Sequence, residues 1–154
     1  MRVLVDTNIV LDYLLERQPF LQDAEALFEA IGSGQVLGYV TATTLTDIFY
    51  IARRQTQDIQ RARQAVSSIL AVMEICSVDR AVLEVALTLA MTDFEDAVQV
   101  GCALAQGLDA IVTRDADFAS TLILISSVSE ILQQLEALLH ETKKDTPLLG
   151  EIVI

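Results

Sequence analysis

Acidic side chains at the ends of short apolar runs are the residues of this sequence best suited to chemistry. Carboxylates that lie close together repel one another unless a cation neutralises them, and oxygen ligands select a hard ion such as Mg²⁺ or Mn²⁺. We therefore expect a metal site if these acids meet. The principal four are Asp6, Asp47, Asp96 and Asp115, with Asp93 and Asp117 close to the last two.

Each acid also has a purely structural explanation. Residues 44–47 (Thr-Leu-Thr-Asp) match the capping-box pattern, and Asp93 stands three positions before Asp96 as a cap would. Acids in a first helical turn also suit the helix dipole. Asp6 could cap a helix, and Asp115 could belong to a turn. Capping does not predict that four separate segments bring acids to one place, so both interpretations stay open for each residue.

The elements that must position these acids are short apolar strands separated mainly by helices. We expect strands at 2–5, 36–40, 75–78, 110–113 and 122–125. We expect helices at 9–15, 20–31, 45–54, from 59 onward, from 80 onward, at 93–106 and from about 127 to 139. Thr43 and Thr44 are expected to cap the third helix, and Asp79 the fifth.

This order of elements indicates an α/β fold. The prediction is a three-layer sandwich in which helices flank a five-stranded parallel sheet on both faces. In open parallel sheets ligands bind outside the carboxyl ends of the strands, near helix N-termini. The acids fall at that edge.

The composition is that of one folded domain. The chain has 154 residues, of which 53% are hydrophobic and 21% charged, which suffices for a single core. We assign residues 1–139 to the domain and 140–154 to a C-terminal tail. No apolar run reaches the ~20 residues that a bilayer requires, and no signal-like leader opens the chain. We therefore expect a cytoplasmic protein with no membrane contact.

The inventory of other reactive residues excludes several kinds of chemistry. The only lysines are Lys143 and Lys144 and the only histidine is His140, all near the C-terminus. Lysine-dependent chemistry and a histidine general base therefore have no candidate inside the core. Cys76 and Cys102 have neither CxxC spacing nor paired histidines, and we interpret them as buried structural thiols.

Four motifs occur in an order and at spacings typical of a known family. They are Val3-Leu-Val-Asp-Thr-Asn8, an acid after the second strand, Asp93-Phe-Glu-Asp-Ala97, and Thr113-Arg-Asp-Ala-Asp-Phe118. Together they resemble the PIN domain, including the VapC-like ribonuclease toxins, over about residues 1 to 130. One departure is Asp47, because the toxins commonly carry the longer Glu at the second acidic position. Ligation by Asp47 is therefore expected to run through water.

The resemblance implies a five-stranded parallel sheet and an endoribonuclease that depends on Mg²⁺ or Mn²⁺. Its catalytic and metal-binding residues would be Asp6, Asp47, Asp96 and Asp115. Mg²⁺ held by one or two carboxylates keeps several waters, and such a water can attack a phosphodiester in line. We assign Asn8 and Thr113, with Asp93 and Asp117, to supporting roles in orienting carboxylates or water. Local turn hydrogen bonds explain Asn8 and Thr113 equally well.

An RNA substrate would have to approach a protein whose net charge is −12, which repels nucleic acid at long range. Four arginines against one aspartate give residues 53–64 a charge of +3, so the remainder carries −15. This contrast predicts a strip that contacts phosphates through Arg53, Arg54 and Arg61. An ordinary solvated helix face explains the same arginines.

Two functional hypotheses follow from these observations. The first is a metal-dependent endoribonuclease, the toxin of a type II toxin–antitoxin pair, with an antitoxin protein as partner and a homodimer as its assembly. The second is a non-catalytic binding or regulatory module that keeps the fold and a metal site. The complete set of acids favours the first, whereas the negative charge and the short Asp47 favour the second.

Overall fold

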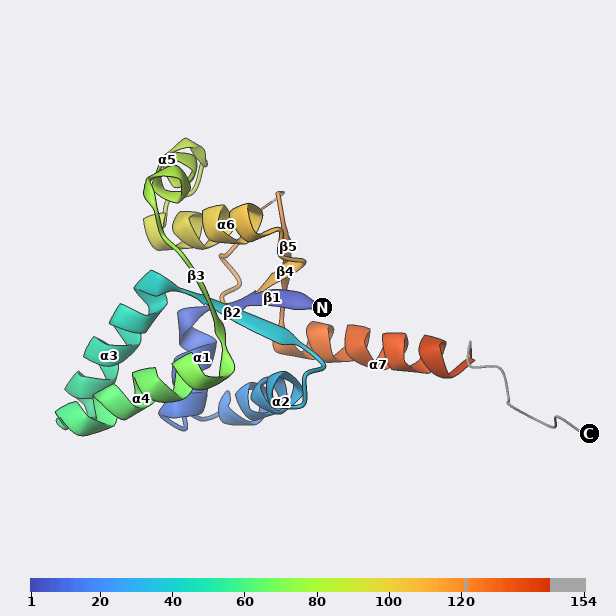
Figure 1. Ribbon diagram of the computed structural model, residues 1–154, viewed down its shortest axis with the longest axis horizontal. Helices are drawn as coiled ribbons and strands as arrows, with labels where there is room; N and C mark the ends of the chain where they lie inside the picture. The colour runs from blue at the N-terminus through green and yellow to red at the C-terminus, as the bar shows by residue number, and fades with distance from the viewer. Residues whose placement is uncertain (121, 145–154) are drawn as a thin grey trace, which may run out of the picture.

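The computed structural model describes residues 1–120 and 122–144 as a parallel sheet between two layers of helices (Figure 1). The strands are β1 (Arg2–Val5), β2 (Leu37–Thr41), β3 (Glu74–Cys76), β4 (Ala110–Val112) and β5 (Leu124–Ser126). The helices are α1 (Thr7–Leu14), α2 (Leu21–Gly32), α3 (Ala42–Thr56), α4 (Ile59–Val72), α5 (Arg80–Thr88), α6 (Phe94–Gln106) and α7 (Val128–Lys144).

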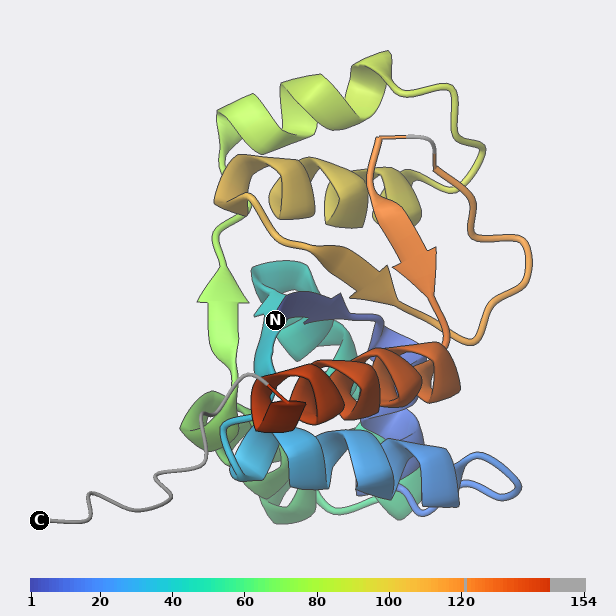
Figure 2. The same ribbon diagram turned by 90° about the vertical axis from the view of Figure 1, so that its right-hand side faces the viewer.

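All five strands are parallel, in the order β3-β2-β1-β4-β5. Side chains alternate between the two faces of the sheet, as the pleat of a strand requires. Val3 and Val5 of β1 belong to a core with α1, α2 and α7, whereas Leu4 belongs to a second core with α5 and α6. Figure 2 shows α5 and α6 on one side of the sheet and α2 and α7 on the other. The predicted three-layer α/β fold is confirmed.

The order of the strands sets the place where a ligand can bind. The chain winds from β1 outward to β3 and then returns to lay β4 against the other side of β1. The carboxyl ends of β1 and β4 therefore flank the topological switch point of the sheet, which is the usual binding crevice in such folds.

The structure corrects several predicted boundaries. The Thr41 side chain caps α3 by accepting a hydrogen bond from the Thr44 N–H at 3.1 Å, so the expected caps at Thr43 and Thr44 are wrong. The helix thus begins three residues before Leu45. At the other end of the chain, α7 continues to Lys144 beyond the expected end at 139, so the assigned start of the tail at 140 falls inside a helix. Residues 145–154 of that tail lie outside the described residues.

Other expectations agree with the structure. Asp79 caps α5 by accepting a hydrogen bond from the Val82 N–H at 3.0 Å. Cys76 and Cys102 are free and buried, and burial raises the pKa of these thiols to about 12 and about 11. Such thiols stay protonated at neutral pH. Among the described residues, no helix combines the length and hydropathy needed to cross a membrane.

Candidate active site

Asp6 stands directly at the switch point, at the junction of β1 and α1. Its backbone N–H donates to the Val112 carbonyl of β4 at 3.0 Å, which fixes it beside that strand. Its carboxylate is only 6% exposed and accepts hydrogen bonds from Gln99 Nε2 at 3.0 Å and Thr113 Oγ1 at 2.8 Å. Although Asp6 occupies the N-cap position of α1, its side chain makes no capping hydrogen bond. The capping interpretation of Asp6 is therefore wrong.

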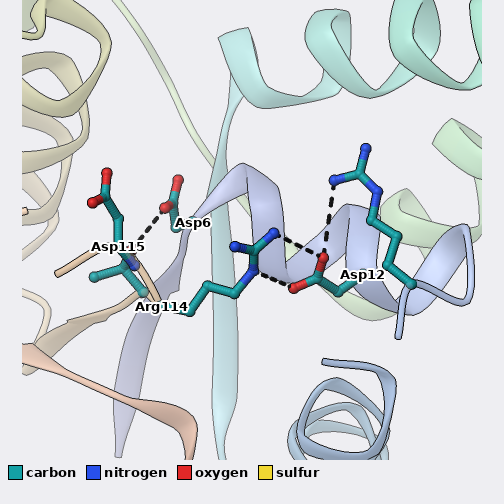
Figure 3. A network of polar contacts seen from close by, with 6 residues as sticks. Asp6, Asp12, Arg114 and Asp115 are labelled. Atoms are coloured by element: carbon teal, nitrogen blue, oxygen red, sulfur yellow. Dashed lines mark hydrogen bonds and ion pairs between the residues drawn. The ribbon is translucent and has the colours of Figure 1, made fainter. Parts of the chain in front are cut away.

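Asp115 lies in the loop that leaves β4, on the same side as Asp6 (Figure 3). The Thr113 hydroxyl links the two acids, because it donates to Asp6 and accepts the Asp115 N–H at 3.1 Å. The loop then turns back on itself as the Asp117 N–H donates to Asp115 Oδ1 at 2.9 Å. Thr113 thus makes both the turn hydrogen bond and the contact to a carboxylate that the sequence left as alternatives.

Asp96 lies in the first turn of α6, in the helical layer formed by α5 and α6. The Asp93 side chain caps this helix and accepts the Asp96 N–H at 3.1 Å, so Asp93 performs the capping and leaves the Asp96 carboxylate free of that role. Burial, followed by repulsion from Asp93, Asp6 and Asp115, raises the pKa of Asp96 to about 6. These interactions show that Asp6, Asp96 and Asp115 lie within electrostatic range of one another.

Asp47 completes the group from α3. It is the sixth residue of that helix, in the second turn rather than the expected first turn, so the capping-box interpretation of residues 44–47 is wrong. Its carboxyl hydrogen-bonds Glu95 of α6. Loss of hydration, the hydrogen bond and the charge of Asp47 raise the pKa of Glu95 to about 7, and Asp6 adds to the shift. Asp6 is therefore a common neighbour of both halves of the acidic cluster.

A series of hydrogen-bonded threonine hydroxyls ends at the Glu95 carboxylate. Thr7 Oγ1 donates to Glu95 Oε1 at 3.3 Å and contacts Thr44 Oγ1 at 2.9 Å, which in turn lies 3.0 Å from Thr41 Oγ1. Each hydroxyl has one proton to donate, so the donation to Glu95 fixes the direction of the chain: Thr41 donates to Thr44, and Thr44 donates to Thr7. The cap of α3 is thereby connected to the acidic cluster.

Three residues that contact the acidic cluster were missing from the sequence prediction: Thr7, Glu95 and Gln99. Glu95 sits between two residues of the recognised motif, and its i, i+4 spacing to Gln99 places both on one face of α6. Gln99 is a polar residue only 1% exposed, and its Oε1 has no hydrogen-bond partner in the described part of the chain. A polar side chain inside the apolar stretch 97–103 is the signal that could have identified it.

Other predicted residues lie away from the cluster. The exposed Asn8 makes no side-chain hydrogen bond to any residue that the structure describes, and the adjacent Thr7 contacts a carboxylate instead. Arg53 and Arg54 occupy the last turn of α3, where their charge suits the helix dipole, and Arg61 lies in α4. All three arginines are exposed. Arg54 follows Asp47 by seven residues, so it projects from the same face of α3 about 10 Å further along.

Within the described part of the chain, the acids do not form a ready-made metal site. Across residues 1–120 and 122–144, no three side chains of His, Cys, Asp or Glu are arranged to hold a metal ion as they stand. The cluster is instead a set of crowded carboxylates, two of which hold protons more tightly than usual.

Comparison with known proteins identifies the fold family. A model of the PIN domain matches residues 2–117, which is three quarters of the chain. The chain belongs to the PIN domain family. The matched range contains the motifs that suggested this family, except for Phe118, the last residue of the 113–118 motif. A search of curated proteins finds no match to the sequence.

Solved structures similar to this PIN domain include several VapC-type proteins. The DNA-bound VapBC structure from Salmonella typhimurium has a TM-score of 0.64 at 17% identity, covering 83% of this chain and 98% of that one. VapC20 of Mycobacterium tuberculosis, a toxin that cleaves the sarcin–ricin loop, has a TM-score of 0.62 at 17% identity, covering 75% and 92%. A toxin–antitoxin complex from Klebsiella pneumoniae has a TM-score of 0.61 at 21% identity, covering 82% and 97%.

Proposed function

We propose that this PIN domain is an endoribonuclease that requires Mg²⁺ or Mn²⁺ and hydrolyses RNA phosphodiesters. The observation that carries the proposal is the meeting of acids from four separate segments at the carboxyl edge of the sheet. The interactions that raise the pKa of Asp96 and Glu95 include Asp6, Asp47 and Asp115. These three acids come from the junction of β1 and α1, from α3 and from the loop after β4. Helix capping does not account for this convergence, because Asp6 and Asp47 cap no helix.

The residues present fit a hard divalent cation. The donor set consists of carboxylates with one buried amide oxygen, Gln99 Oε1, that lacks a partner among the described residues. The ligands would be Asp6, Asp47, Asp96 and Asp115, and Glu95 would add a carboxylate beside the short Asp47. When bound, the ion neutralises the acids and acts as a Lewis acid toward phosphate and water.

The other residues of the cluster prepare it for that charge. Thr113 and Gln99 hold the Asp6 carboxylate in one orientation, so its oxygens need no reorganisation when a cation enters. The chain of hydroxyls from Thr41 to Thr7 does the same for Glu95. Protons on Asp96 and Glu95 must leave before these groups can ligate, which makes metal binding dependent on pH.

RNA would approach along the exposed arginines of α3 and α4. Arg54 shares the helix face of Asp47, so a phosphate held by Arg54 would lie on a path that leads to the acids. Arg53 and Arg61 would extend this contact along the phosphate backbone of the RNA. This strip offsets locally the repulsion expected from a net charge of −12.

A toxin role and an antitoxin partner belong to the same proposal. Similar structures include VapBC complexes and a toxin–antitoxin complex, at identities of 12 to 21%. We propose a cytoplasmic toxin that a small antitoxin protein restrains and that forms a homodimer. Co-purification of the protein with the product of a neighbouring small gene tests the partner, and light scattering tests the dimer.

Cleavage of a mixed RNA pool in Mg²⁺, Mn²⁺ or EDTA tests the proposed activity. We expect cleavage with either ion and none in EDTA, and loss of cleavage in Asp96→Asn. The matched control is Asp79→Asn, which alters a helix cap outside the cluster and should cleave as the wild type does. A protein that binds Mn²⁺ but cleaves no RNA would refute the nuclease and support the non-catalytic module instead.

A further inference from the structure

A buried ion pair lies outside the acidic cluster and uses a residue adjacent to it. Asp12 of α1 is 1% exposed, yet its carboxylate carries no role in the cluster. Both of its oxygens accept from Arg114, with Arg114 Nε at 2.7 Å from Oδ2 and Nη2 at 3.2 Å from Oδ1 (Figure 3). A second cation is close by, with Arg17 Nη1 at 3.9 Å from Asp12 Oδ1.

Arg114 stands between the two residues that organise the Asp115 loop. Thr113 before it holds Asp6, and Asp115 after it belongs to the acidic cluster. The guanidinium of Arg114 also stacks over the Phe20 ring at 3.9 Å. One side chain thus ties the loop after β4 to α1 and to the connection between α1 and α2.

These contacts hold the Arg114 guanidinium by one edge and one face. Nε and Nη2 are both engaged with Asp12, one face of the guanidinium covers Phe20, and the side chain is only 34% exposed. A bidentate pair of this kind defines direction as well as distance. The Nε–Nη2 edge is therefore committed to Asp12, and the position of Arg114 next to the acids points to a role in holding the loop.

Stability alone does not explain the pair. Removing two charges from water costs as much as their attraction returns, and apolar residues in their place often stabilise a fold equally well. What an apolar pair cannot supply is a defined orientation of the loop. Asp6 and Asp12 lie at the start and in the second turn of the same helix, about 9 Å apart along its axis, so α1 can act as a rigid spacer between them.

We propose that Asp12 and Arg114 are positioning residues that hold the Asp115 carboxylate at a fixed place relative to Asp6. This inference rests on the proposed nuclease function, which gives the position its purpose. The pair clamps the loop after β4 onto α1, the helix that directly follows Asp6. Asp115 then needs no ordering when a cation and RNA arrive.

The test uses a double variant, Asp12→Ala/Arg114→Met, because Arg114→Met alone would strand a buried carboxylate and could unfold the protein. The double variant preserves the net charge of the chain, so it leaves the long-range attraction or repulsion of RNA unchanged. Arg17→Met is the matched control, since it removes a cation near the same carboxylate without touching the loop. Arg114→Lys preserves the charge but removes the two-point contact.

Steady-state cleavage of an RNA oligonucleotide, thermal unfolding and amide hydrogen exchange are measured on each variant. In the double variant we expect kcat to fall about 100-fold, with KM within about twofold of the wild type and Tm within a few degrees. Exchange of the Asp117 amide, which bonds Asp115, should accelerate. Arg114→Lys should lose about tenfold in kcat, and Arg17→Met should match the wild type.

The outcomes separate the two proposals. Wild-type kcat and wild-type exchange in the double variant would overturn the positioning role and leave the nuclease standing. If the double variant fails to fold, a folded Arg114→Lys protein with the kcat of the wild type overturns the positioning role. If the wild type cleaves no RNA, the nuclease fails, and hydrogen exchange still decides whether the pair holds the loop.

Discussion

Replacing Asp96 by Asn separates the functional role of the acid from a structural one. The substitution keeps the shape of the side chain and removes one charge from a site where burial and three neighbouring acids raise the pKa of Asp96 to about 6. If that shift from the ordinary value of 3.8 were fully expressed, it would correspond to about 3 kcal/mol. The carboxyl is only partly buried, so screening by water reduces this to about 1 to 1.5 kcal/mol.

The opposing effect is the loss of a negative charge in the first turn of α6. That interaction contributes about 0.5 kcal/mol, and the cap itself is untouched because Asp93 provides it. The metal-free Asp96→Asn protein should therefore be about 0.5 to 1 kcal/mol more stable than the wild type at pH 7.5. It should also lose metal-dependent cleavage.

The gain in stability should depend on pH in a defined way. A carboxyl whose folded pKa is raised contributes its full stability below the unfolded value and loses it as the pH rises through the folded value. The wild type therefore loses this contribution between about pH 4 and pH 6, whereas the variant has none to lose. The difference should be close to zero at pH 4 and complete above pH 6.

These effects are measured by urea unfolding in EDTA at pH 4 and at pH 7.5, together with the RNA cleavage assay. Asp79→Asn is the control, because Asn also caps helices well and the residue lies outside the cluster. It should change neither stability nor cleavage. An Asp96→Asn protein that is less stable at pH 7.5 and fully active would refute the reasoning and leave Asp96 a residue of the helix terminus.

Three further predictions concern the metal, the RNA and the packing. Mg²⁺ at roughly 10 mM should raise Tm because it binds only the folded state. The increase in Tm should shrink below about pH 7, because protons compete with the ion for Glu95 and Asp96. An increase that is constant from pH 5 to 8 would contradict this. Arg54→Gln should weaken RNA binding and lower the slope of log affinity against log salt by about 0.7 in anisotropy titrations, whereas an unchanged slope would remove Arg54 from the interface. Gly101→Ala should cost about 1 kcal/mol in urea unfolding, because its Cβ would meet the Val82 carbonyl at 3.1 Å, and a stabilised variant would show that α5 can move away.

Much of the fold was readable from the sequence because its signals are local. Short apolar runs bounded by helix-forming segments predicted all five strands. Because these runs are apolar throughout, they also predicted a sheet covered on both faces, and the near-continuous burial of β1 and β4 agrees with this. Asp79 was recognisable as a cap because its partner is three residues away. Asp6, Asp96 and Asp115 were recognisable as a group since each follows or opens an element at the carboxyl edge of a parallel sheet.

Boundaries were less predictable where neighbouring residues compete for the same role. Four residues from Thr41 to Thr44 include three threonines, and any of them can cap a helix by its hydroxyl. Which one does so depends on where β2 ends, and pairing with β3 carries that strand as far as Thr41. This shift of the helix start moved Asp47 out of the first turn.

Only the tertiary structure decided which polar groups meet. Gln99 and Asp6 are 93 residues apart in the chain, and Arg114 and Asp12 are 102 apart, so no periodicity connects either pair. The encounter of Asp47 with Glu95 likewise depends on how α3 and α6 approach the sheet from opposite layers. Residue types and spacing determined that acids would gather at one edge, because strand direction alone sends them there. The hydrogen bonds that orient those acids, and the ion pair that holds the Asp115 loop, arise from side chains that come into reach only when both layers have packed.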